Sequence, residues 1–336
     1  MGPVRKSGSR VLSAMIVSLA LVAMTAMTGT GQALAATGTV QALAASGGSP
    51  RLSSLRLPAG ATAVPALSSG PDTTCPTVFL IGARGSGETS GGAFHGLGAE
   101  VNKLLSVAAG YLKGKSRQLT YRTYAVNYPS LSVNVLKPTD IGKGLKYYYD
   151  HNIKRYVNSI VTGRKDLVAL AHKLHNRCSS TAMIFAGYSQ GAMVVHQAVN
   201  ALAGRGDEVL PCIYGTILLG DGDRVPHAAA KEFGTSPSKG EGIGNWIASE
   251  LGLSLGPDVN SWPSRANICN NYDVVCDTSL AAVLHFSTSA GVHTSYAKKN
   301  KNGSYTYEKV LTTAANWDAG QVWSRLNSAP QACGLS

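Results

Sequence analysis

The feature that most constrains the fold of this 336-residue chain is a glycine-rich turn, Gly187-Tyr-Ser-Gln-Gly191, between two apolar segments. Thr181–Ala186 is short, apolar and bounded by turn residues, which is typical of a buried parallel strand. Ala192–Leu202 is mostly apolar and predicts a buried helix. A strand, a sharp turn and a helix in this order lift a serine hydroxyl out of a parallel sheet, because the glycines give the backbone room. The sequence therefore predicts that Ser189 is a nucleophile.

A second glycine-rich turn also carries a serine at its apex. The turn Gly82-Ala-Arg-Gly-Ser-Gly-Glu88 follows the apolar segment Thr77–Ile81, which is a candidate strand. A backbone N–H in such a turn can stabilise the negative charge that develops on a reacting carbonyl oxygen. A nucleophile and an oxyanion hole are two of the three parts of a serine hydrolase.

Strand and helix signals alternate along the rest of the chain. Strands are predicted at 77–81, 119–128, 181–186 and 212–219, and helices at 97–112, 140–177, 192–202 and 313–326. The helical stretch at 140–177 is expected in at least two pieces, with a break near Gly163. This alternation predicts an α/β fold in which helices cover both faces of a mostly parallel sheet. Ligands should bind beyond the carboxyl ends of the strands, where both serine turns lie.

The first 35 residues resemble a secretory signal peptide. A basic start precedes the apolar stretch Val11–Met27, and Ala33-Leu-Ala35 is a small-x-small cleavage site. A second copy of this tail ends at Ala45, so cleavage is expected after Ala35 or near Ala45. We therefore expect a secreted, extracellular protein.

The remaining chain divides into a leader and one domain. Residues 36–73 are rich in Ala, Gly, Ser, Thr and Pro, which predicts a flexible leader. Residues 74–336 are expected to form a single domain with an insertion at about 224–268 and a C-terminal extension. No later segment is apolar over the length of a membrane span, so no transmembrane segment is predicted. The net charge of +12 comes from scattered basic residues, and we expect a monomer that binds no nucleic acid.

The chain contains six cysteines, an even number that in an exported protein predicts three disulfides. The cysteines are Cys75, Cys178, Cys212, Cys269, Cys276 and Cys333. Fifteen pairings are possible, and their spacing alone does not choose among them. No pair has the spacing of zinc ligands, so no metal site is predicted.

A serine nucleophile needs a histidine as general base, and the histidine needs a carboxylate to hold its tautomer. In a sheet of this kind the three residues follow the chain order serine, acid, histidine. That order leaves His285 and His293 as candidate bases.

Asp273 is the favoured acid, because it lies in the eight-residue segment Cys269–Cys276. A disulfide across that segment would hold the carboxylate rigidly, and a displacement of about 1 Å can lower a rate about 100-fold. Asp221 and Asp223 are rivals, since they directly follow a predicted sheet strand, where the ordinary role of an aspartate is in a turn or helix cap.

Four motifs occur in a fixed order: Gly82–Glu88, Gly187–Gly191, Cys269-x-x-x-Asp-x-Val-Cys276 and His293-Thr-Ser-Tyr296. Together they resemble the cutinase family of secreted α/β-hydrolases, over roughly residues 72–300. The resemblance implies an α/β-hydrolase-type three-layer sandwich.

The resemblance also implies roles for individual residues. Ser189 would be the nucleophile, Asp273 the acid and His293 the base. The oxyanion hole would consist of the backbone N–H of Gln190 and the N–H and hydroxyl of Ser86. His285 remains an alternative base, because it lies at nearly the spacing of the family's short members; His293 is preferred because Tyr296 follows it.

The family pattern implies the disulfides Cys75–Cys178 and Cys269–Cys276, and Cys212 and Cys333 would then pair by exclusion. Residues 224–268 exceed the family's compact connection. They are interpreted either as a flap over the site, with Trp246 and Ile247 as its apolar underside, or as a packed surface insertion.

The reaction that the resemblance implies is ester hydrolysis through an acyl-enzyme, without a metal or cofactor. Its substrates would be cutin-like polyester, glycerides or soluble esters with short to medium acyl chains. Two alternatives stay open: an acetyl esterase acting on a polysaccharide such as xylan, and a non-catalytic exported surface protein on a hydrolase scaffold.

Overall fold

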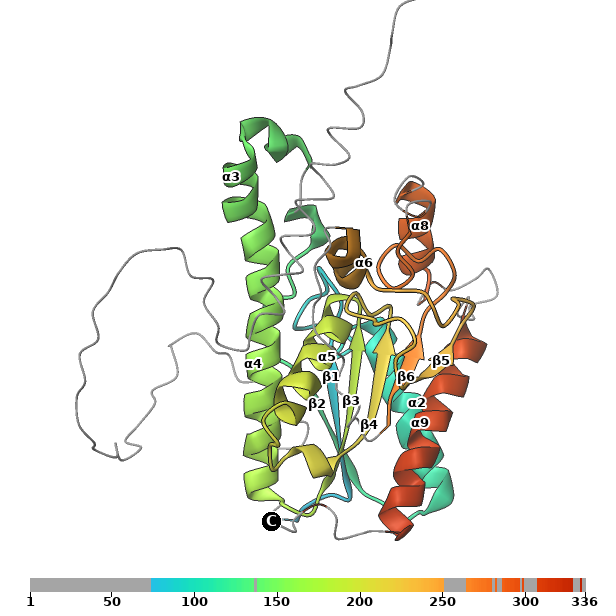
Figure 1. The fold of residues 1–336 in the computed structure, drawn as a ribbon. Helices are drawn as coiled ribbons and strands as arrows, with labels where there is room; N and C mark the ends of the chain where they lie inside the picture. The colour runs from blue at the N-terminus through green and yellow to red at the C-terminus, as the bar shows by residue number, and fades with distance from the viewer. Residues whose placement is uncertain are drawn as a thin grey trace, which may run out of the picture.

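A parallel sheet organises the part of the chain that the structure describes (Figure 1). The computed structural model describes residues 74–135, 138–250, 264–279, 282, 286–296, 298, 307–328 and 333. The predicted signal peptide and leader, and the alternative base His285, lie outside the described residues. Within those residues, no helix has both the length and the apolar character needed to cross a bilayer.

The sheet has six strands in the order β2-β1-β3-β4-β6-β5, and every neighbouring pair is parallel. The strands are β1 (Val78–Ala83), β2 (Tyr121–Ala125), β3 (Ala182–Tyr188), β4 (Ile213–Leu219), β5 (Lys231–Phe233) and β6 (Ala266–Ile268). Their carboxyl ends lie at one edge of the sheet, as parallel strands require. The predicted α/β fold with a mostly parallel sheet is confirmed.

Helices cover both faces of this sheet and complete three layers. Helices α2 (Ala99–Lys115) and α9 (Glu308–Ser328) cover one face, and α4 (Lys154–Arg177) and α5 (Gln190–Ala203) cover the other (Figure 1). Three shorter helices lie beyond the carboxyl ends of the strands: α3 (Leu145–Tyr148), α6 (Ile243–Glu250) and α8 (Phe286–His293). Short 3-10 or π-helical segments occupy Val133–Val135, Pro138–Lys143, Tyr149–Ile153 and Leu210–Cys212.

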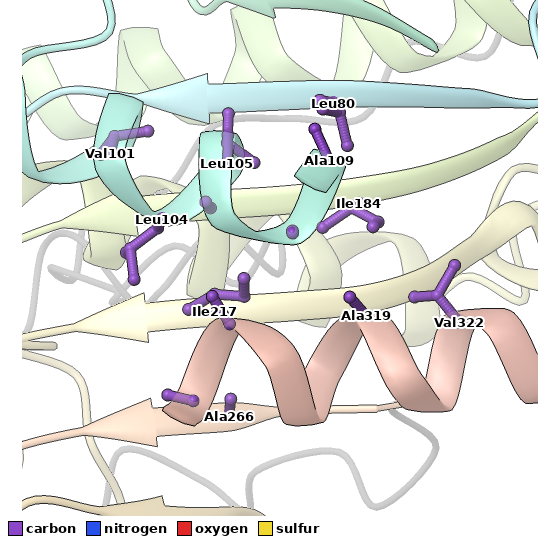
Figure 2. Close-up of a cluster of buried hydrophobic side chains, with 14 of the residues drawn as sticks. Leu80, Val101, Leu104, Leu105, Ala109, Ile184, Ile217, Ala266, Ala319 and Val322 are labelled. Carbon is purple, nitrogen blue, oxygen red and sulfur yellow. The ribbon is translucent and has the colours of Figure 1, made fainter. Parts of the chain in front are cut away.

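Successive side chains of each central strand point to opposite faces of the sheet and pack into two separate hydrophobic cores. Phe79 and Ile81 of β1 pack under α4 and α5, whereas Leu80 packs under α2 and α9. Figure 2 shows the second core, in which Leu80 and Ile184 of the sheet lie beside α2. Because both faces of the sheet are covered, the central strands β1, β3 and β4 are buried along their whole length and largely apolar, which is why their sequence pattern predicts buried parallel strands. The edge strands β2 and β5 are exposed or half-buried.

The predicted break near Gly163 is wrong, because α4 runs without interruption from Lys154 to Arg177. The irregular turn lies earlier, at Tyr149–Ile153. A Cβ atom at Gly163 would lie 2.7 Å from Val194 Cγ2 and 2.9 Å from the Tyr128 ring. The glycine therefore allows helix α4 to approach α5 closely and does not end it.

The segment interpreted as an insertion contributes two strands to the sheet. Sequence analysis did not predict β5 or β6, which are three residues long and hold one edge of the sheet. Strand β6 pairs with β4 and leads directly into the Cys269–Cys276 segment. The sheet therefore fixes where that segment begins.

Three disulfides tie the periphery to this core. The structure joins Cys75 to Cys178, Cys269 to Cys276, and Cys212 to Cys333. These are the two pairs that the resemblance implies and the third that follows by exclusion. The Cys212–Cys333 bridge attaches the C-terminal segment to the start of β4.

A buried carboxyl group in α9 predicts an unusual pH dependence of stability. Asp318 is fully buried; its Oδ1 accepts hydrogen bonds from the Thr216 N–H (3.2 Å) and the Ser264 hydroxyl (3.1 Å). Its Oδ2 has no hydrogen-bond partner among the described residues. Burial raises the pKa of Asp318 to about 7 and outweighs the two hydrogen bonds, which favour the charged carboxylate.

Between about pH 4 and pH 7 the folded protein keeps the Asp318 proton that the unfolded chain has lost, so stability should fall as the pH rises through this window. We expect Asp318→Asn to raise the free energy of unfolding at pH 8 by roughly 3 kcal/mol. The gain should largely vanish at pH 4.5, where the native carboxyl is neutral. Urea unfolding at both pH values measures the difference; equal effects at the two would contradict the prediction.

Candidate active site

Ser189 lies at a sharp turn between β3 and α5, and its backbone has φ 54° and ψ −119°. Two close backbone approaches make this turn possible. A Cβ at Gly187 would lie 2.3 Å from the Gly191 carbonyl oxygen, and one at Gly191 would lie 2.0 Å from the Ala83 oxygen. Only glycine fits at either position, so the two glycines of the motif allow the positive φ of the serine between them.

His293, the last residue of α8, contacts the serine directly. Its Nε2 lies 2.8 Å from Ser189 Oγ, and the imidazole is 7% exposed. The ring stacks on Tyr188 at a centroid distance of 5.3 Å, and the Tyr188 hydroxyl donates to the His293 carbonyl (2.9 Å). Aromatic stacking and the carbonyl contact hold the imidazole over the end of β3.

The Asp273 carboxylate is the hydrogen-bond partner of the other imidazole nitrogen, Nδ1. His293 Nδ1 lies 2.9 Å from Asp273 Oδ1 and 3.0 Å from Oδ2. The carboxylate is fully buried and also accepts hydrogen bonds from the Tyr296 hydroxyl (2.9 Å) and the Val275 N–H (2.8 Å). Burial by itself raises the pKa of Asp273, but the His293 imidazole and these donors outweigh it and hold the pKa below its usual value. The carboxylate therefore stays ionised.

The disulfide-closed segment Cys269–Cys276 holds this carboxylate in place. The Asp273 N–H donates to the Asn270 carbonyl (3.0 Å), and the Asp277 carboxylate accepts from the Tyr272 N–H (2.8 Å). Tyr272 adopts a positive φ of 64°, which makes the segment turn tightly. Strand β6 on one side and the disulfide on the other leave the acid little freedom.

The turn after β1 lies at the same edge of the sheet, beside the start of α5. The buried guanidinium of Arg84 braces it by donating to the carbonyl groups of Glu88 (2.8 Å), Val126 (3.2 Å) and Tyr128. The Gly87 N–H donates to the Ser130 carbonyl (2.8 Å). Ser86, at the apex, is half-buried.

These motifs match a known family. The model of the Cutinase family matches residues 74–310. The chain belongs to the cutinase family. The predicted membership is confirmed, and with it the prediction of a carboxylic ester hydrolase at the level of the family.

Named relatives of this cutinase-family chain include acetylxylan esterases and cutinases. It is 42% identical over 52 residues to an acetylxylan esterase of Hypocrea jecorina; the match spans 16% of each chain, about a sixth of that relative's length. Among solved structures it is similar to the catalytic core domain of acetyl xylan esterase from Trichoderma reesei (17% identity, 73% of this chain and 100% of that one, TM-score 0.44). It is also similar to a cutinase-like protein from Cryptococcus sp. (20%, 66% and 91%, TM-score 0.43).

Asp221 and Asp223, the alternatives to Asp273 as the acid of this cutinase-family site, lie in a separate cluster. Asp221 Oδ2 lies 2.6 Å from His196 Nδ1, and Asp223 Oδ2 accepts from the Gln197 amide (2.8 Å). All four side chains are buried. The structure thus pairs His196 of α5 with Asp221 and brings His293 and Asp273 to Ser189.

Glu88, the last residue of the glycine-rich motif, links that turn to α2. Its carboxylate accepts hydrogen bonds from the Gly85 N–H (2.5 Å) and from the Ala99 N–H (3.1 Å), the first residue of α2. Burial and the neighbouring Glu88 charge raise the pKa of Glu100 to about 7. In the sequence Glu88 is visible only as part of a motif. Arg84 and Tyr188 carry no signal there, because a buried residue that supports a turn through hydrogen bonds has no sequence signature of its own.

The first part of helix α6 and the turn before it are fixed to the site. The Gly242 N–H donates to Arg224 O (2.8 Å), the Ile243 N–H to Val275 O (2.8 Å) and the Gly244 N–H to Gly222 O (3.0 Å). Trp246 is 7% exposed, whereas the Ile247 side chain lies outside what the structure describes. These contacts favour a packed insertion over a free flap for residues 240–246.

One glycine beside the imidazole yields a prediction. Gly220 has φ +62°, and a Cβ there would lie 2.8 Å from His293 Cε1. We expect Gly220→Ala to displace the imidazole and to lower kcat for p-nitrophenyl butyrate by at least about 10-fold. Gly206→Ala is the matched control, since Gly206 has φ +61° with open space around it. It should lower the melting temperature and leave kcat unchanged; equal losses of kcat in both variants would contradict the prediction.

Proposed function

We propose that this protein is a secreted serine esterase that hydrolyses carboxylic esters through Ser189, His293 and Asp273. The observation that carries the proposal is the continuous contact from Ser189 Oγ to His293 Nε2 (2.8 Å) and from Nδ1 to Asp273 (2.9 Å). An ionised Asp273 keeps the imidazole proton on Nδ1, so the Nε2 lone pair faces the hydroxyl that it must deprotonate.

The reaction follows from these contacts. His293 Nε2 takes the Ser189 proton while Oγ attacks the ester carbonyl, and the backbone N–H of Gln190 with the N–H and hydroxyl of Ser86 stabilises the oxyanion. The carbon–oxygen bond to the alcohol then breaks, and His293 returns the proton to the leaving alkoxide. Water, deprotonated by the same nitrogen, attacks the acyl-enzyme carbonyl; the bond to Ser189 Oγ then breaks, His293 returns the proton to Oγ, and the acid is released. The positive charge of the imidazolium is offset throughout by Asp273.

The acyl part of the substrate is an aliphatic chain of short to medium length, in keeping with the family. A second candidate is an acetyl ester on a polysaccharide, which is favoured by the 42% identity over 52 residues to an acetylxylan esterase. The disulfides, the family and the N-terminal pattern support secretion, and we retain the single domain and the monomer as part of the proposal.

The test is labelling followed by a substrate series. A fluorophosphonate probe should attach to Ser189, located by peptide mass spectrometry; an unlabelled pure protein would favour a non-catalytic surface protein. Initial rates on p-nitrophenyl esters from acetate to octanoate, on tributyrin and on acetylated xylan then separate the two substrate classes. A preference for butyrate and longer chains supports the aliphatic ester, and rapid release of acetate from xylan with slow tributyrin hydrolysis supports the polysaccharide.

A further inference from the structure

Tyr156 of helix α4 touches the serine that is proposed to stabilise the oxyanion. Its hydroxyl oxygen lies 2.7 Å from Ser86 Oγ, and the side chain is 8% exposed. None of the four sequence motifs includes Tyr156, and the proposed reaction assigns it no role. A buried phenol that is hydrogen-bonded to the Ser86 hydroxyl nevertheless restricts the directions in which that hydroxyl can donate its proton.

The direction of this hydrogen bond matters, because a serine hydroxyl has a single proton to donate. Ser86 can stabilise an oxyanion only if its proton is aimed at the substrate, and it must then accept from Tyr156. If Ser86 donated to Tyr156 instead, the oxyanion would face a lone pair. The partners of Tyr156 therefore determine whether the hydroxyl helps or opposes the reaction.

The neighbours on α4 and α5 fix that direction. Ser159 Oγ accepts from the Leu131 N–H (3.2 Å) and donates to Gln190 Oε1 (3.2 Å). The other end of the Gln190 amide, Nε2, donates to the Leu131 carbonyl (3.4 Å). The Gln190 amide is thus engaged by Ser159 and Leu131, and among the described residues Ser86 Oγ is the hydrogen-bond partner of the Tyr156 hydroxyl. A buried phenol proton without an acceptor would cost free energy.

The phenol proton is then left for Ser86. We infer that Tyr156 is a positioning residue that directs the Ser86 hydroxyl proton toward the oxyanion, because Ser86 accepts the phenol proton and keeps its own proton for the substrate. This inference rests on the proposed function. Burial raises the pKa of Tyr156, so the phenol keeps the proton that it must donate.

A double-mutant cycle tests the inference with p-nitrophenyl butyrate as the probe. Ser86→Ala removes an oxyanion donor and should lower kcat about 100-fold. Tyr156→Phe should lower kcat about 10-fold with KM within about twofold, because the oriented hydroxyl acts on the transition state and not on the bound ester. In the Ser86→Ala background, Tyr156→Phe should cause no further loss, since the phenol acts only through Ser86.

Two outcomes would overturn the inference: an unchanged kcat in Tyr156→Phe, or the same 10-fold loss with and without Ser86. Tyr214→Phe is the matched control, because Tyr214 is 1% exposed and lies in the opposite core. It should leave kcat unchanged. If Tyr156→Phe does not fold, Tyr156→Met, which also lacks the hydroxyl, takes its place and should give the same 10-fold loss, again only when Ser86 is present; an equal loss without Ser86 would overturn the inference. An inactive wild-type protein would instead overturn the proposed function, and this inference with it.

Discussion

Ser189→Ala is expected to lower kcat/KM for p-nitrophenyl butyrate by about 10⁴-fold or more, because it removes the hydroxyl that is proposed to form the acyl-enzyme. The nucleophile and the base act as one unit, so His293→Ala should cause a loss of similar size. The measurement is initial rates over a range of ester concentrations with purified protein. Labelling by a fluorophosphonate probe should disappear in Ser189→Ala.

His285→Ala serves as the control for the choice of base. His293 lies 2.8 Å from Ser189 Oγ, and we therefore expect the His285 variant to keep wild-type kcat within about threefold. Circular dichroism and the melting temperature should be similar in all three variants. A Ser189→Ala protein that keeps more than about 1% of the wild-type rate, or a His285→Ala protein that loses its activity, would refute this assignment.

Asp273→Asn should lower kcat about 10⁴-fold while leaving the fold intact. The carboxylate accepts the Nδ1–H of His293; an amide can offer an N–H in its place and stabilise the tautomer that carries the proton on Nε2. In that tautomer the imidazole cannot accept the Ser189 proton. Because the pKa of Asp273 lies below its usual value, the wild-type carboxylate stays ionised from pH 5 upward. The loss in the variant should therefore be present across pH 5–8, measured as kcat at each pH.

The molecule supplies a matched control for this substitution. Asp221 forms a second buried carboxylate–imidazole pair, with His196, at 2.6 Å. Asp221→Asn should change the free energy of unfolding and leave kcat within about threefold. If Asp221→Asn abolishes activity and Asp273→Asn does not, the acid has been assigned to the wrong aspartate.

The sequence predicted the central part of the fold from local chemistry. Three of the four long strands, β1, β3 and β4, are continuous and largely apolar segments, because both faces of a parallel sheet are covered. The fourth, the edge strand β2, shows the alternation of a half-buried strand. Both patterns are visible without any tertiary information. The turn between β3 and α5 was also predictable from local sequence, because its backbone requires glycines at 187 and 191. Strands β5 and β6 were not predicted, because three residues are too few to show a period and their pairing partners lie elsewhere in the chain.

Gly163 shows why some local signals were misinterpreted. A glycine within a helical pattern is read as a break when only its neighbours in sequence are known. In the structure its missing side chain makes room for Val194 and Tyr128, and the helix continues. The reason for this glycine is a contact between α4 and α5, which a linear pattern does not contain.

For the candidate site, the sequence by itself determined which residue types could react and the order in which they occur: a serine at a strand-to-helix turn, then an aspartate within a cysteine-bounded segment, then a histidine. It left two histidines and three aspartates open on residue chemistry alone. The tertiary structure decided which of them meet, pairing His293 with Asp273 and His196 with Asp221. It also decided the contacts of Tyr156 and Tyr188. The physical reason is that reactivity and turn geometry are properties of short segments, whereas hydrogen-bond contacts at 2.6–3.0 Å between residues 20 or more positions apart depend on how the whole sheet and its helices pack.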